Sequence, residues 1–388
     1  MLSPPTTQAF DVLQLGMGWL PEQPGNGLDR MYHNLTDALP RAGVGVRGLV
    51  TGSDAVFRTS GGRVRAFAPE SASLVSRLSS VRRETRVALL EHPVDLVAAH
   101  FALYAAPILD LLNDRPLVVH FHGPWALESG AEGASCLHTR SKKLLERLVY
   151  RRATRCIVLS EAFRDVLTRE YQIPADRIEI VPGGVDVDRF DTGRSRSNAR
   201  RHLGWPTDRP IVLSVRRLTH RMGLESLIDA IDEIRSQHPD VLLHIAGQGP
   251  LRDDLERRVD AAGLSDHVRL LGFVPDDDLP LAYRAADVSI VPTAALEGFG
   301  LITIESLAAG TPVLVTPVGG LPEAVSGLSS SLVLDGHTPS ALAAGLHEAL
   351  DAPGRLPSAA ACQAYARRHF SWDAVARRTR AVYETALS

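Results

Sequence analysis

Residues 286–316 read ADVSIVPTAALEGFGLITIESLAAGTPVLVT. The apolar runs over 286–292 and 311–316 predict two strands, and a helix is expected between them from about Gly300. Strands that are apolar on both faces and alternate with helices are typical of a buried parallel sheet with helices on both sides. This stretch therefore predicts an α/β fold.

The same alternation extends over most of the chain. Helices are expected from about Gly223 and from about Pro250. Further strands are predicted at 11–15, 94–99, 117–121, 156–160, 210–215, 241–247 and 268–273, and further helices at 28–41, 137–151 and 161–169.

The pattern is interrupted at 191–201, DTGRSRSNARR, whose polar composition predicts a linker or exposed loop. We therefore expect two doubly wound, Rossmann-like domains, residues 1–190 and 202–370, with an interdomain cleft at the carboxyl ends of their strands. An amphipathic helix at about 371–388 closes the chain. Its periodicity leaves open whether it packs on its own domain or back on the first.

The composition is that of an ordinary globular protein. The chain has 388 residues, of which 45% are hydrophobic and 22% charged, and its net charge of −3 gives no basic field for nucleic acid. Its three cysteines form no CxxC pair, which disfavours a zinc site and fits a reducing compartment. The first residues lack a signal-peptide pattern, and no apolar run has the ~18–20 residues of a membrane span. A cytoplasmic protein is expected.

The helix after 286–292 provides the first candidate site. Gly298 and Gly300 permit a tight turn at its start, and its free N–H groups and positive dipole end would suit a diphosphate. Glu305, about one turn further on, could accept two hydrogen bonds from a ribose diol, and Glu297 could meet a sugar or a cation. In the simpler interpretation, both acids only complement the helix dipole.

Three arginines follow the predicted strand 210–215. Arg216, Arg217 and Arg221 fall in a loop before the next helix. Guanidinium groups bind phosphate through paired hydrogen bonds and stay charged at all physiological pH values. Surface arginines on a loop are the alternative interpretation.

Two histidines mark the end of the predicted strand 117–121. His120 and His122 are two residues apart and therefore face the same side. His122 could contact a sugar hydroxyl, whereas His120 fits a structural role better. A metal site is disfavoured because no carboxylate or thiolate lies near them in the sequence.

A glycine-rich segment follows the first strand: LQLGMGWLPEQPGNG, residues 13–27. It lacks the third glycine of G-x-G-x-x-G, and neither a Walker A nor a G-x-S-x-G sequence occurs in the chain. Gly16 and Gly18 could still bring backbone amides close to the phosphate or sugar of a ligand.

A basic amphipathic segment lies at 140–155. Its apolar residues, Leu144, Leu145, Leu148 and Val149, are surrounded by seven Lys and Arg residues. The favoured interpretation is a solvated helix with its apolar stripe in the core. A weak association with the inner surface of a membrane is the alternative.

Taken together, these segments resemble glycosyltransferase family 4, whose members are retaining enzymes with the GT-B fold. The resemblance covers nearly the whole chain and depends on the order and spacing of its pieces. They are HG (122–123), VPGGVD (181–186), RRLTHRMG (216–223), LHIAGQGP (243–250), LLGFVP (270–275), EGFGLITIE (297–305), GTPVLVTPVGGLPE (310–323) and FSWDAVARR (370–378).

The resemblance implies roles for individual residues. Glu297 and Glu305 correspond to the two acids of the family's E-x7-E motif, beside the transferred sugar and on the ribose diol. Arg217 corresponds to the phosphate arginine, and His122 to a histidine near the sugar C6 hydroxyl. The further donor-binding residues implied are Gly16, Gly18, Arg216, Arg221, Gly247, Val274, Phe299, Gly300, Leu301 and Ile302.

One position departs from the family. The lysine usual before the glycine of the R-x4-K-G stretch is Met222 here. Methionine cannot bind phosphate electrostatically, so Arg221 or Arg216 would have to supply the charge.

The sequence therefore predicts a retaining hexosyltransferase that needs neither cofactor nor metal. Its donor would be a nucleotide-diphosphate sugar, UDP- or GDP-linked, and its acceptor a carbohydrate, a lipid-linked or a small molecule selected by the loops at 51–63 and 124–140. The alternatives are a nucleotide-sugar epimerase and a non-catalytic sugar-nucleotide-binding partner. A metal-binding D-x-D at Asp186 and Asp188 is disfavoured because it lies just before the linker.

Overall fold

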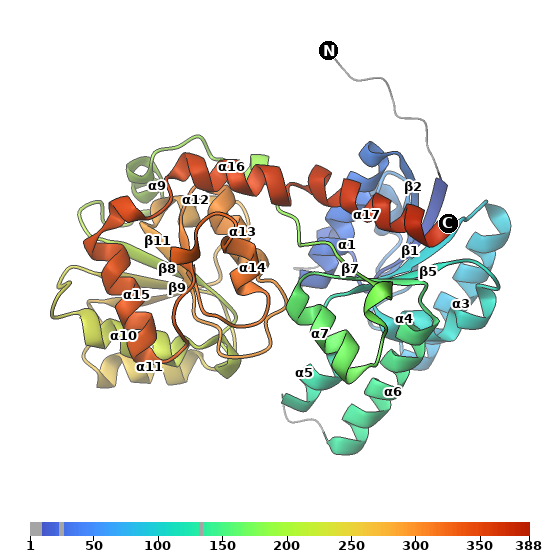
Figure 1. The fold of residues 1–388 in the computed structure, drawn as a ribbon, viewed down its shortest axis with the longest axis horizontal. Helices are drawn as coiled ribbons and strands as arrows, with labels where there is room; N and C mark the ends of the chain where they lie inside the picture. Colours follow the sequence, from blue (N-terminus) through green and yellow to red (C-terminus); the bar gives the residue numbers. More distant parts are fainter. Residues whose placement is uncertain (1–9, 23–26, 132–134) are drawn as a thin grey trace, which may run out of the picture. The chain divides into compact units, whose positions relative to one another are not determined.

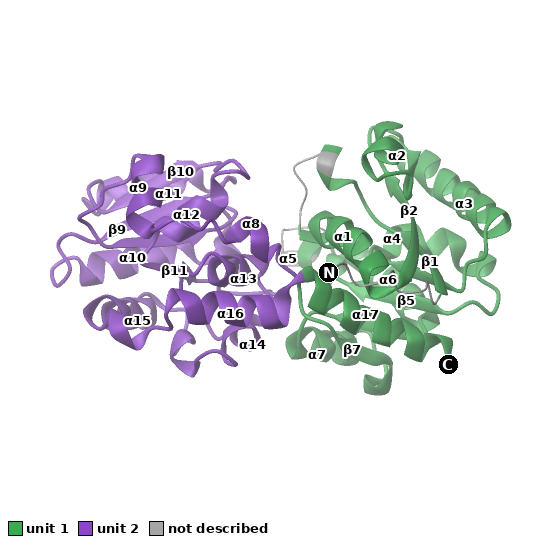
Figure 2. Ribbon diagram, turned by 90° about the horizontal axis from the view of Figure 1, so that it is seen from above, with its two compact units in different colours: residues 1–183, 372–388 green, residues 184–371 purple. Residues whose placement is uncertain are grey.

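The computed structural model describes residues 10–22, 27–131 and 135–388. It divides into two compact units (Figure 2): unit 1 comprises residues 1–183 and 372–388, and unit 2 comprises residues 184–371. Each unit contains one parallel sheet (Figure 1). The predicted fold class, two doubly wound α/β domains, is confirmed.

Unit 1 is built on a seven-stranded sheet with strand order β3-β2-β1-β4-β5-β6-β7. The order reverses between β1 and β4, which makes the carboxyl ends of these central strands the expected ligand-binding edge. The strands are β1 (Phe10–Leu15), β2 (Val44–Thr51), β3 (Val64–Ala68), β4 (Leu96–Ala99), β5 (Leu117–Phe121), β6 (Arg155–Val158) and β7 (Ile178–Ile180).

Helices cover this sheet, and apolar residues from both form the core. Leu13, Val97, Val119 and Val158 from the strands pack in one buried cluster with residues such as Val149 from the helices. The main helices are α1 (Gly27–Ala38), α3 (Leu74–Glu91), α5 (Trp125–Ala131), α6 (Cys136–Arg152) and α7 (Glu161–Glu170).

Unit 2 is built on a five-stranded sheet with strand order β10-β9-β8-β11-β12. Its order reverses between β8 and β11, so the loops after these two strands meet at the switch point. The strands are β8 (Ile211–Val215), β9 (Leu242–Ala246), β10 (Val268–Gly272), β11 (Val288–Val291) and β12 (Val313–Val315), and the helices include α9 (Arg196–Leu203), α10 (Leu224–Ile234), α11 (Arg252–Ala261), α12 (Leu279–Ala285), α13 (Leu301–Ala308), α14 (Leu321–Val325), α15 (Pro339–Asp351) and α16 (Ala359–Phe370).

The prediction of a linker over 191–201 is wrong from residue 196 onward. Helix α9 begins there, and the side chain of Ser195 caps it by accepting a hydrogen bond from the amide of Asn198. Arg200 is buried and donates to Ala285 O and to Asp287, which fastens α9 to the rest of unit 2. The Arg-rich composition thus reflects a helix anchored by charge-assisted bonds, and the boundary between the units lies earlier, after Gly183.

The last helix, α17 (Trp372–Leu387), belongs to unit 1. Its Tyr383 is fully buried. The Tyr383 hydroxyl lies 2.8 Å from Nε2 of His120 on β5 and accepts a hydrogen bond of 3.4 Å from Nε2 of Gln14 on β1. The helix therefore packs on the central strands of the first sheet. Its periodicity alone left open which of the two domains it would pack on.

Helix α6 differs from the favoured prediction for the basic segment. Its buried residues are Glu146, Val149 and Tyr150, but Leu144 and Leu148 are 70% and 58% exposed. The expectation that the whole apolar stripe lies in the core is therefore wrong for these two leucines. No helix in the part of the chain that the structure describes is long and apolar enough to cross a bilayer.

The buried position of Tyr383 predicts a large effect of truncation. We expect Tyr383→Ala to lower the free energy of unfolding by about 3–5 kcal/mol, because it leaves a cavity under α17 and removes the partner of His120. Urea unfolding followed by circular dichroism measures this change. Thr385→Ala, at an exposed position on the same helix, should change stability by less than about 0.5 kcal/mol. Equal effects of the two substitutions would contradict the assignment of α17 to unit 1.

Candidate active site

The carboxyl edge of the unit 2 sheet is organised by one ion pair. Arg216, directly after β8, donates from Nη2 to Oε2 of Glu297 over 2.6 Å and to the hydroxyl of Thr293 over 2.6 Å. The two charged side chains are only 7% and 14% exposed. Because a charge-assisted bond strengthens as water is excluded, this pair fixes the Glu297 carboxylate at the switch point between β8 and β11.

The backbone around this pair is packed so closely that only glycine fits. A Cβ on Gly247, after β9, would lie 1.8 Å from Arg216 O, and a Cβ on Gly319 would lie 1.8 Å from Glu297 O. Both glycines also have positive φ values, of 146° and 58°. Gly247, predicted to bind the donor, thus has a packing role against the arginine loop.

Helix α13 begins three residues after Gly298. Gly300 is its N-cap, with a φ of 74° and no side-chain cap, so no side chain of its own satisfies the first N–H groups. Leu301 and Ile302 are half-buried, and Phe299 packs edge-on against Phe370 with ring centroids 5.6 Å apart. The amino end of this helix is built as an anion site would be.

The second acid of the motif is held separately. Glu305 is 7% exposed and accepts a hydrogen bond of 3.2 Å from the Tyr283 hydroxyl of α12. No acidic residue lies in the first turn of α13. Each acid thus has a partner of its own, Glu297 with Arg216 and Glu305 with Tyr283.

The other predicted donor-binding residues of unit 2, and Met222 beside them, differ in exposure and in their contacts. Arg217 is exposed, and within the described residues its guanidinium has no hydrogen-bond or ion-pair partner. Arg221 donates to Leu296 O over 2.8 Å, which ties the arginine loop to the segment before Glu297. Met222 is buried at 4% exposure. Val274 is half-buried beside Phe273, which is 59% exposed.

The carboxyl edge of unit 1 carries three stacked histidines. His100 and His120 stack with ring centroids 4.2 Å apart and planes at 7°, and Nδ1 of His100 lies 3.0 Å from Nε2 of His122. The structural role predicted for His120 agrees with its burial and its contact with Tyr383. Nδ1 of His122 is buried without a partner among the described residues, which leaves it available to a ligand.

Burial keeps these three histidines neutral. It lowers the pKa of His122 to about 4. Burial first, and then the neighbouring imidazoles, holds the pKa of His100 and of His120 well below the usual value. At neutral pH, His122 therefore offers a neutral ring, held in orientation by His100.

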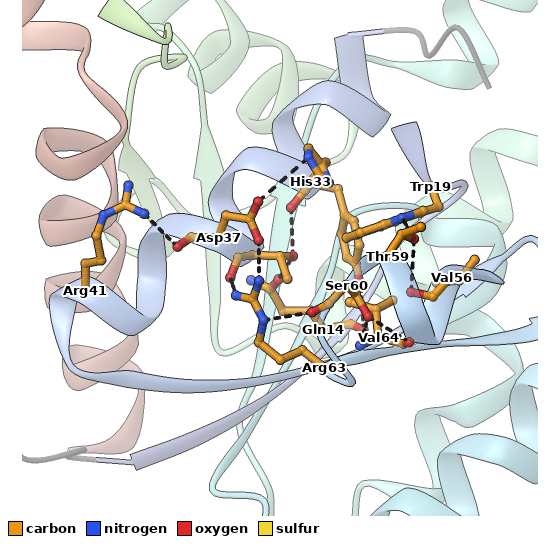
Figure 3. Close-up of polar contacts among 12 residues, drawn as sticks. Gln14, Trp19, His33, Asp37, Arg41, Val56, Thr59, Ser60, Arg63 and Val64 are labelled. Carbon is orange, nitrogen blue, oxygen red and sulfur yellow. Dashed lines mark hydrogen bonds and ion pairs between the residues drawn. The ribbon is translucent and has the colours of Figure 1, made fainter. Parts of the chain in front are cut away.

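The loop after β1 is fixed by side chains of unit 1. Gly16 donates its amide to Leu49 O and Gly18 to Oδ1 of Asp29, each over 2.9 Å. Trp19 donates from Nε1 to the Thr59 hydroxyl over 2.9 Å (Figure 3). Residues 23–26 of the predicted glycine-rich segment lie outside the described residues. The described part of this loop directly follows β1, one of the two strands between which the strand order reverses.

The two acids of the disfavoured D-x-D have structural partners. The Asp186 side chain caps α8 (Val187–Phe190) by accepting from the amide of Arg189, and Asp188 accepts from Arg367 over 2.8 Å. Elsewhere in the described ranges, too, no group of three or more His, Cys, Asp or Glu residues is arranged to hold a metal ion.

Several residues of these two edges were missed by sequence reasoning. Thr293 and Tyr283 hold the two acids, and the hydroxyl of Thr303, buried at the start of α13, has no partner among the described residues. His100 was missed although it follows the predicted strand 94–99 as His122 follows 117–121. That repeated position was the one available signal.

Two family models match the chain along most of its length. The family model "Glycosyl transferases group 1" matches residues 195–369, and the model "Glycosyltransferase Family 4" matches residues 25–189. The chain is 34% identical over 305 residues to D-inositol 3-phosphate glycosyltransferase of Corynebacterium jeikeium, an alignment that covers 75% of this chain and 72% of that protein. The chain belongs to glycosyltransferase family 4.

Two further similarities limit what the relatives show about this chain. The enzyme of the same name from Corynebacterium kroppenstedtii is 32% identical over 259 residues, covering 64% of this chain but only 56% of the relative. HepE of Anabaena, solved with UDP and glucose, superposes with a TM-score of 0.76 at 21% identity and covers 97% of this chain and 100% of HepE. At that identity the similarity shows the GT-B fold alone.

The buried histidines predict a loss of stability at mildly acidic pH. Unfolded His122 takes up a proton near pH 6.5 but folded His122 only near pH 4, so the unfolded state binds more protons between these values and stability falls as pH drops. From this residue we expect a loss of about 2 kcal/mol between about pH 7.5 and pH 5.

Urea unfolding at the two pH values measures this loss. His122→Asn should show a smaller loss than the wild type, whatever its absolute stability, because the titrating group is gone. The same pH dependence in both proteins would contradict a depressed pKa at His122.

Proposed function

We propose that this protein transfers a hexose from a nucleotide-diphosphate sugar to an acceptor hydroxyl, with retention at the anomeric carbon and without a metal ion. The observation that carries the proposal is the fixed Arg216–Glu297 pair beside the uncapped amino end of α13, at the switch point of the second sheet. Family membership supports the transfer reaction. The identities of the nucleotide, the sugar and the acceptor are part of the proposal.

The diphosphate leaving group gains negative charge as the bond to the sugar breaks. Arg217 and the N–H groups at the start of α13 would stabilise that charge where it develops, which is the most effective place for electrostatic catalysis. Glu305 would hold the ribose diol, and Glu297 would accept hydrogen bonds from the transferred sugar. The acceptor hydroxyl would then attack from the face that the diphosphate leaves.

His122 is the residue of unit 1 that we propose binds a sugar hydroxyl. Its neutral ring can donate or accept one hydrogen bond through Nδ1, the atom that has no partner among the described residues. Acceptors to be tested include carbohydrates, lipid-linked sugars and inositol phosphates, the last because relatives are named for D-inositol 3-phosphate.

Proton NMR of the reaction with UDP- and GDP-hexoses tests this function. The proposal expects a product whose anomeric proton keeps the configuration of the donor, formed only when an acceptor is present. A product of inverted configuration would overturn the retaining mechanism. Donor converted without any acceptor would indicate an epimerase, and donor bound but never consumed would indicate a non-catalytic protein.

Removal of Arg217 should slow the chemical step. We expect Arg217→Ala to lower kcat/KM by roughly 10²–10³-fold, the usual loss for one group that stabilises developing charge. Arg252→Ala, at an exposed arginine on α11 that pairs with Glu256, serves as the matched control and should leave kcat/KM within about twofold. Full turnover by Arg217→Ala would refute the phosphate role.

Arg216 is our candidate for the charge that Met222 lacks. Its guanidinium is buried against Glu297, and its Nε has no partner among the described residues, so the Nε–H group remains for a ligand oxygen. The backbone of residue 221 accepts from the amide of Ala294 over 2.9 Å. A side chain at position 222 therefore starts beside the segment that leads to Glu297.

This assignment predicts that the charge can be moved. We expect Arg216→Met to lower kcat/KM by roughly 10²-fold, and the added substitution Met222→Lys to recover at least tenfold of that loss. Arg216→Met combined with Met222→Leu provides a control of similar volume without charge. Equal activities of the two double variants would refute the exchange.

A further inference from the structure

The outer face of helix α6 carries large apolar side chains that nothing in the described structure covers. Leu137, Leu144 and Leu148 are 80%, 70% and 58% exposed. With about 100° between successive residues, these three positions fall within an arc of roughly 40° on one side of the helix. They form a continuous apolar stripe, which we call the leucine stripe.

Basic side chains border the leucine stripe. On the helical wheel, exposed Arg140 and Arg151 lie on one flank. Half-buried Arg152 lies on the other flank, where it donates to Asn113 O over 2.8 Å. Residues 136–152 contain six Lys and Arg residues and a single acid, Glu146. That acid is 1% exposed and faces inward, where it accepts hydrogen bonds from Tyr150 and Tyr171. The outer face of α6 therefore carries apolar and cationic side chains and no acid of its own, although Glu170 of α7 pairs with Lys143.

The inner face of α6 already packs on unit 1. Val149 and Tyr150 are buried in the core, and Lys142 lies over the ring of Trp125 on α5, 4.2 Å from its centroid. The core of unit 1 thus uses the opposite face of α6, and the leucine stripe is a separate apolar surface. An apolar stripe of this size costs free energy in water unless a second surface covers it.

We infer that the leucine stripe docks the protein on the surface of a bilayer that contains anionic phospholipid, with α6 lying parallel to the membrane plane. Leucines would enter the boundary between headgroups and acyl chains, and the exposed Arg140 and Arg151 would meet the phosphates. The match of charges selects this occupant. A second copy paired about a two-fold axis would bring the same arginines against each other, which disfavours a dimer. The chain as a whole has a net charge of −3, so the attraction to anionic lipid comes from α6 and not from the protein's overall charge.

Vesicle sedimentation tests the inference on the full chain. We expect the protein to sediment with vesicles of phosphatidylcholine containing about one quarter phosphatidylglycerol, and to remain in the supernatant with pure phosphatidylcholine. Added salt should weaken the binding, because it screens the attraction to the arginines.

Variants separate the leucine stripe from general stickiness. Leu137→Ser/Leu144→Ser/Leu148→Ser should weaken partitioning by about tenfold or more, and Arg140→Glu/Arg151→Glu by a similar factor. The matched control is Val75→Ser/Leu90→Ser on α3, where the two side chains are 78% and 80% exposed. This control should bind as the wild type does.

The inference is overturned if the wild type fails to sediment with anionic vesicles, or if the triple serine variant binds them as tightly as the wild type. It is also overturned if light scattering shows a wild-type dimer that the triple variant converts to a monomer, because the stripe would then be an interface between copies. Circular dichroism of each variant checks that the fold is kept. None of these outcomes depends on the proposed transferase activity.

Discussion

The salt bridge between Arg216 and Glu297 organises the second half of the molecule. It joins the loops after β8 and β11, the two strands between which the order of the sheet reverses. A carboxylate this poorly exposed would be costly without its partner. The neighbouring backbone is adapted to the pair, since the carbonyls of both residues lie against glycines that no larger residue could replace. The sugar-contacting acid of the proposed mechanism is therefore positioned before any ligand arrives.

The sequence was most informative where a pattern was local. The strands of both sheets that carry the site, and the start of α13 at Gly300, follow from apolar runs and from glycines at fixed positions. Long-range partners could not be predicted in this way. Nothing near Glu297 in the sequence points to Arg216, and nothing near His120 points to Tyr383, because these pairs are brought together only by the order of the strands and by the return of α17 to unit 1.

Two errors have a common physical cause. The composition of the Arg-rich stretch 191–201 predicts a linker, and the amphipathic pattern of α6 predicts that its leucines lie in the core. Composition records how polar a segment is but not which face another element covers. In α9, the buried Arg200 donates hydrogen bonds to Ala285 O and to Asp287. In α6, Leu144 and Leu148 lie on the exposed side of the helix. Both helices show that burial is decided by tertiary partners, which a single sequence does not display.

Nucleotide binding at the carboxyl edge of the second sheet is the central claim, and isothermal titration calorimetry with UDP, GDP, ADP and TDP tests it most directly. The account predicts that at least one of these diphosphates binds the wild-type protein in the absence of divalent metal, and that its affinity falls by about tenfold or more in Glu305→Gln, which weakens the grip on the ribose. Binding of none of the four, or equal binding to both proteins, would contradict it.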